Sequence, residues 1–117
     1  MSSLKSPEHG HLIDLNTLAT ELRRDDRYQR KGQVARTIVH TPDLRVVLIA
    51  LAREHTITEH HAGATVTVHC LSGRLRLRLP DRHVDLSAGN LLAMGANLSH
   101  DVSAVEDSVF VLTLGAS

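Results

Sequence analysis

The segment Arg74–Leu79 alternates strictly between arginine and leucine over its whole length. Successive side chains of a β-strand point to opposite faces, so this period of two is typical of a half-buried strand. We predict that the leucines face a core and the arginines face water. A row of arginines can also bind anions, but charged side chains are mostly exposed, so we interpret this row as a solvated sheet face.

Short apolar segments rich in β-branched residues continue on both sides of this strand, and turn residues such as Thr41-Pro42-Asp43 separate them. The pattern has no parallel βαβ repeat. Roughly eight to ten short strands with turns at this spacing predict an all-β sandwich or small barrel. The predicted strands include residues 34–40, 44–52, 65–71, 74–79, 83–86, 91–94, 98–102 and 108–114.

The N-terminal part of the chain has a different pattern. Residues 1–11 form a polar tail, and apolar residues then recur at three- and four-residue spacing over 12–22, which predicts a short helix capped by Asp14 or Asn16. The mixed charges of 23–27 indicate a solvated face or a helix end. We therefore expect a tail and short helix over 1–33 and a barrel over 34–117, forming one domain overall.

Composition narrows the possible partners. The 117 residues carry no net charge, which argues against nucleic acid or an anionic membrane as the main partner. Only Tyr28 and Phe110 are aromatic, so a sugar-stacking surface is disfavoured. A single cysteine excludes an internal disulfide. The sequence has no apolar leader segment and no run of about 20 apolar residues, so we expect a soluble, cytoplasmic protein.

One stretch concentrates groups that bind metals. Glu59, His60 and His61 stand before a small-residue turn and a predicted strand. Divalent transition metals bind imidazole and carboxylate groups, so this tripeptide is a candidate for a metal site. The alternative interpretation is a polar strand end in water.

Two stretches at fixed spacing resemble the paired motifs of the cupin family. The family's second motif has a glycine, a Pro-x-Gly turn and a histidine, and Gly89–His100 follows it in every interval. Gly95 replaces the proline and Asn97 replaces the second glycine. Because asparagine tolerates a left-handed backbone, we still expect a turn there.

The first motif is kept only in part. Its spacing, which ends at Gly73, puts Glu59 at the first histidine position and His61 at the second, and it puts Val66 where the family has a glutamate. The usual ligand set of three histidines and a glutamate therefore cannot form. Strand alternation places Glu59 and His61 on one face and His60 on the other.

The resemblance implies a double-stranded β-helix of the cupin type, a jelly-roll barrel also described as RmlC-like. It implies a metal site formed by Glu59, His61 and His100, which suits one divalent ion of iron, zinc, manganese or nickel. No organic cofactor is expected. We expect Val66, Val68 and Cys70 to point into the barrel and line its pocket.

Three functions remain open at this stage. The chain is either an enzyme or binding protein that uses a metal, a metal-free ligand-sensing module, or a structural cupin. The missing glutamate favours the metal-free interpretation, and the set Glu59, His61 and His100 favours the first. Since the fold hosts many activities, it does not decide between them. We also expect a small-molecule ligand and a homodimer that uses residues 34–40 or the N-terminal helix.

Overall fold

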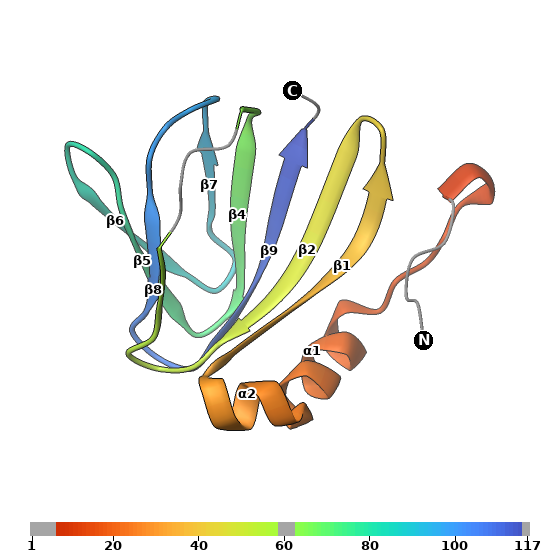
Figure 1. Cartoon of the computed structure of the whole chain (residues 1–117), viewed down its shortest axis with the longest axis horizontal. Coiled ribbons are helices and arrows are strands. Elements are labelled where there is room, and N and C mark those ends of the chain that lie inside the picture. The colour runs from red at the N-terminus through yellow and green to blue at the C-terminus, as the bar shows by residue number, and fades with distance from the viewer. Residues whose placement is uncertain (1–6, 59–62, 116–117) are drawn as a thin grey trace.

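The computed structural model describes residues 7–58 and 63–115 of the chain. Within these ranges nine strands form two antiparallel sheets that face each other (Figure 1). The five-stranded sheet has the order β1-β2-β9-β4-β7, and the four-stranded sheet has the order β3-β8-β5-β6. The strands are β1 Gln33–Thr41, β2 Leu44–Leu51, β3 Thr56–Thr58, β4 Val66–Ser72, β5 Arg74–Arg78, β6 His83–Ser87, β7 Leu91–Met94, β8 Asp101–Ala104 and β9 Ser108–Gly115.

An aliphatic core fills the space between the two sheets. On β5, Leu75 and Leu77 are fully buried while the three arginines are exposed, as the alternation predicted. Phe110 of β9 lies in the same core. The all-β class and the double-stranded β-helix with a short N-terminal helix are therefore confirmed.

Helix α1, Leu15–Arg24, covers the outer face of the five-stranded sheet over β1, β2 and β9 (Figure 1). Asp14 caps it, because its carboxylate accepts hydrogen bonds from the backbone N–H groups of Asn16 and Thr17 at 3.1 and 3.2 Å. The apolar side of the helix packs on the sheet through Leu15, Leu18, Ala19 and Leu22.

A second helix, α2 at Asp26–Lys31, was not predicted from the charged run. Its cause is local capping. The Asp25 carboxylate accepts hydrogen bonds from the Arg27 backbone N–H at 2.8 Å and from the Arg27 guanidinium. The guanidinium bond is the main reason that the pKa of Asp25 falls to about 2. Gly32, with φ of 77°, ends the helix.

The edges of the five-stranded sheet are β1 and β7. An edge strand leaves backbone groups available for pairing, so the expected homodimer through residues 34–40 stays a prediction. None of the helices within the described residues is long and apolar enough to cross a membrane. The cytoplasmic location also stays a prediction.

Leucine 22 tests the role of α1. It is fully buried against the sheet, whereas Leu12, just before the helix, is 95% exposed. Replacing Leu22 with alanine leaves a cavity, so we expect Leu22→Ala to lower the free energy of unfolding by about 2–5 kcal/mol. The matched change Leu12→Ala should alter it by less than about 0.5 kcal/mol. Urea denaturation measures both, and equal effects would show that α1 contributes little to the stability of the barrel.

The β4–β5 turn depends on Gly73, the residue that closes the first motif. Its φ is 84°, and a Cβ there would lie 2.3 Å from the backbone oxygen of Asp107 and 2.4 Å from the Ser108 hydroxyl. That hydroxyl accepts a hydrogen bond from the Arg74 backbone N–H at 3.0 Å. The glycine is therefore required both by its backbone conformation and by the close approach of the β8–β9 connection.

Gly89 separates the effect of backbone conformation from the effect of steric overlap. Its φ is 90°, but a Cβ there would meet nothing within 4 Å. Gly89→Ala should cost only the left-handed backbone strain, about 1–2 kcal/mol. We expect Gly73→Ala to cost a further 1–3 kcal/mol, roughly, from the steric overlap. Thermal and urea unfolding of the two variants give the comparison. Similar losses in both would mean that the neighbouring backbone moves aside at little cost.

Candidate functional site

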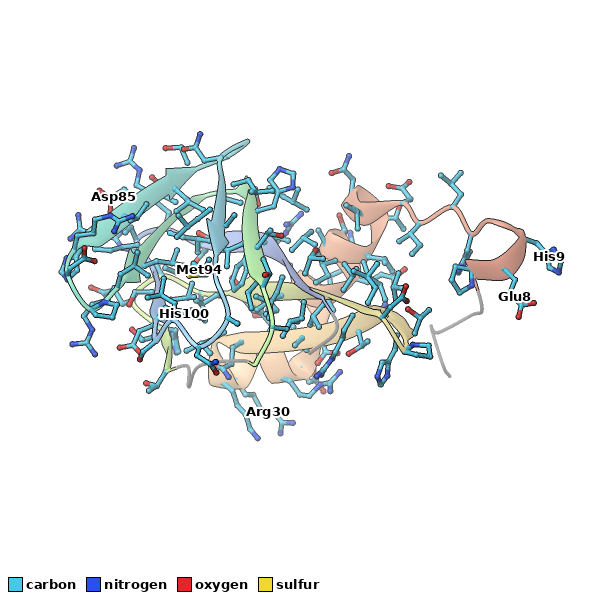
Figure 2. The ribbon with its side chains drawn as sticks, turned by 90° about the horizontal axis from the view of Figure 1, so that it is seen from above. Glu8, His9, Arg30, Asp85, Met94 and His100 are labelled. Atoms are coloured by element: carbon cyan, nitrogen blue, oxygen red, sulfur yellow. The ribbon has the colours of Figure 1, made fainter. Side chains whose placement is uncertain are left out.

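His100 is the one predicted metal ligand that lies within the described residues. It directly precedes β8, and by strand alternation it shares the inward face with Val102 and Ala104 of the core. Its residue surface is only 4% exposed. Seen from above in Figure 2, His100 and Met94 lie between the two sheets, whereas Asp85 lies on the periphery.

A tight turn positions this histidine. The backbone N–H of Leu98 donates to the Gly95 carbonyl at 3.4 Å, and Asn97 has a φ of 67°. A left-handed residue at the third position is what a type II turn requires, so the turn expected from the second motif is confirmed. The expected strand over 98–102 was wrong at its start, because this turn delays β8 until Asp101.

The geometry of the His100 ring fixes which nitrogen carries its proton. Nδ1 lies 3.0 Å from the backbone oxygen of Leu98. A carbonyl oxygen can only accept, so Nδ1 of the neutral ring donates and Nε2 keeps its lone pair. Within the described residues no buried side-chain nitrogen or oxygen lacks a hydrogen-bond partner. A ring protonated at Nδ1 is the form in which a histidine binds a metal or accepts a proton.

A surface cavity of about 400 Å³ opens beside His100. The end of β5 and the start of β8 form its walls, because Arg78 pairs with Asp101 across the two strands. Its lining residues are Arg78, Leu79, Pro80, Ser99, His100 and Asp101. The sequence pattern predicts that Arg78 is part of a solvated sheet face, and it assigns Asp101 to no site. The missing information is the strand register. It places Arg78 opposite Asp101, the residue that directly follows His100.

The other two predicted ligands, Glu59 and His61, lie outside the described residues, as does His60. Thr58, the residue before Glu59, is the cross-strand partner of Asp101, the residue after His100. Within the described residues, no group of three histidine, cysteine or acidic side chains is placed to hold a metal ion. The predicted ligand set is therefore neither supported nor contradicted by these residues.

The residues predicted to line the interior lie on β4. Val66, Val68 and Cys70 are all buried in the core between the sheets. Val66, at the position of the family's glutamate, pairs across the sheet with Met94 and Leu114 and so has apolar neighbours. Burial raises the pKa of the Cys70 thiol, which suits a small buried apolar residue rather than a nucleophile.

The sequence matches no protein-family model and no curated protein. Solved structures do match. A conserved protein of unknown function from Streptococcus pyogenes has a TM-score of 0.73 at 22% identity, and the match covers 100% of this chain and 96% of that one. A cupin superfamily protein from Desulfitobacterium hafniense has a TM-score of 0.70 at 13% identity, with 73% and 78% covered.

A variant of oxalate decarboxylase from Bacillus subtilis also matches, with a TM-score of 0.68 at 20% identity; the match covers 73% of this chain and 26% of that one. At such identities the likeness establishes the fold alone. It confirms the cupin fold that the two motifs predicted.

The protonation of the His100 ring can be measured directly. We expect long-range proton–nitrogen NMR spectra, recorded where the His100 ring is neutral, to show this ring protonated at Nδ1. The reason is that the Leu98 carbonyl accepts a hydrogen bond from Nδ1. His83, which is exposed at the start of β6, serves as the comparison ring. A His100 ring protonated at Nε2 would contradict the arrangement described above.

Proposed function

We propose that this chain, a cupin in fold, binds one divalent transition metal on the His100 side of the barrel and presents it to a small molecule. The ligands would be Glu59, His61 and His100. The observation that carries the proposal is the hydrogen bond from Nδ1 of His100 to the Leu98 carbonyl, because it holds the ring with the Nε2 lone pair available.

Chain connectivity supports the same ligand set. Thr58 lies opposite Asp101 in the pairing of β3 with β8. Asp101 directly follows His100, so the end of β3 at Thr58 lies in the neighbourhood of His100. Two imidazoles and one carboxylate suit zinc, iron, manganese or nickel and leave coordination positions for water or a ligand.

A metal bound by these residues would act as a Lewis acid that polarises an oxygen of the ligand. The chain itself would orient the site. The turn ending at Leu98 holds the His100 ring, and the cavity beside it admits a small molecule.

A metal-free ligand-binding module is the second candidate, and the surroundings of Val66 favour it. This position has lost the family's glutamate, and its cross-strand neighbours Met94 and Leu114 offer no replacement ligand. In that case His100 would act through its Nε2 lone pair as a hydrogen-bond acceptor or a general base.

Metal analysis separates the two candidates. We expect protein purified without chelators to contain close to one equivalent of a transition metal, and metal-stripped protein to take up zinc or manganese in calorimetric titrations. His100→Gln should weaken that uptake at least about tenfold, because one of three ligands is lost. The exposed His83 provides the control, and His83→Gln should bind metal like the unchanged protein.

Absence of metal in the purified protein, together with no uptake by the stripped protein, would exclude the first candidate. Equal uptake by the His100→Gln variant would instead place any metal elsewhere on the chain. Thermal melts of both variants show whether the fold is intact.

A further inference from the structure

The cavity beside His100 carries a cation at its rim. Arg78 ends β5 on the outward face, and its side chain is 69% exposed. Its guanidinium donates to the carboxylate of Asp101, whose side chain is 17% exposed. Both residues line the same cavity as His100. A ligand that reaches the imidazole through this cavity therefore passes a positively charged group.

The donors of Arg78 are only partly used. A guanidinium has five N–H donors in a planar fork that matches a carboxylate. One guanidinium nitrogen of Arg78, Nη2, donates to Asp101, and this is the single hydrogen bond of the Arg78 side chain within the described residues. Arg76, two residues earlier on the same face, differs because two of its nitrogens donate to Asp85, at 2.8 and 3.2 Å. Arg78 is thus the arginine of this strand that lines the cavity with donors available.

The remaining walls are suited to a short organic acid. Leu79 and Pro80 give an apolar surface, and the exposed Ser99 and the buried His100 give polar groups. A volume of about 400 Å³ is within the usual range for small-molecule sites. We propose that the cavity binds a small carboxylate whose anionic group is held by Arg78 and whose other end lies toward His100. This inference builds on the proposed function by naming the class of its ligand.

In this proposal Asp101 competes with the ligand's carboxylate for the guanidinium of Arg78. Its carboxylate accepts from the same guanidinium that the ligand's carboxylate would engage. An ion pair whose arginine lies in water contributes little to stability, so an incoming carboxylate can replace Asp101 or share the Arg78 guanidinium with it. Removing the Asp101 charge should therefore strengthen ligand binding, whereas removing Arg78 should weaken it. A purely structural ion pair predicts no such opposition.

Succinate is a suitable probe, and its uncharged analogue succinamide is the matched control. The full chain, labelled with ¹⁵N and stripped of metal on a chelating resin, is titrated with each compound and followed by amide chemical shifts. We expect saturable shifts with succinate, centred on residues 78–82 and 99–101, and none with succinamide. Using metal-free protein separates this inference from the proposed metal site, since either can fail without the other.

Variants complete the test. Arg78→Gln should weaken succinate binding at least about tenfold, because charge-assisted bonds to the carboxylate are lost. Arg74→Gln is the matched control on the same strand and face; Arg74 does not line this cavity, so this variant should bind succinate with unchanged affinity. Asp101→Asn should tighten binding several-fold, and Asp43→Asn, in the distant β1–β2 turn, controls for net charge.

The inference is overturned if succinate and succinamide shift the same amides equally, or if Arg74→Gln weakens binding as much as Arg78→Gln does. Weaker binding by a folded Asp101→Asn variant would also overturn it, since Asp101 would then be part of the ligand site rather than its competitor.

Discussion

Burial of β2 and β9 on both faces is the constraint on which the rest of the structure depends. On β2, Val47, Ile49 and Leu51 face the core between the sheets, while Leu48 and Ala50 face α1. A strand that is apolar on both sides is stable only if both sides are covered. Helix α1 is therefore not an appendage. Without it the outer face of the five-stranded sheet would expose a continuous aliphatic patch.

Much of this fold could be predicted because its signals are local and periodic. The alternation of Arg74–Leu79 gave both the strand and its orientation, and the continuous apolar run of 44–52 indicated a strand without a solvated face. Helix α2 could not be predicted from periodicity, since it has no buried residue. A single side chain, Asp25, caps its start, and such hydrogen bonds are visible only once the backbone is placed.

Less of the candidate site than of the fold could be predicted from the sequence. Motif spacing identified His100 and the turn at Asn97, because both depend on intervals along one chain. The tautomer of His100 was beyond the sequence, since it depends on where the Leu98 carbonyl points after that turn. Arg78 was interpreted as part of a solvated face, because its position beside His100 comes from the register of β5 against β8, a contact between distant segments. Glu59 and His61 remain predictions from the motif alone.

Val66 makes one wall of the barrel apolar, and the polar groups that line a cavity lie elsewhere, at the strand ends. A glutamate in place of Val66 would put a charge beside Met94 and Leu114, and a buried charge is stable only when it is paired or bound to a metal. The valine side chain instead packs in the apolar core between the sheets. Polar groups that could bind a ligand lie at the strand ends, where Ser99, His100 and Arg78 line one cavity. The aliphatic interior gives these groups a rigid support, and such support is what a site with few ligands needs most.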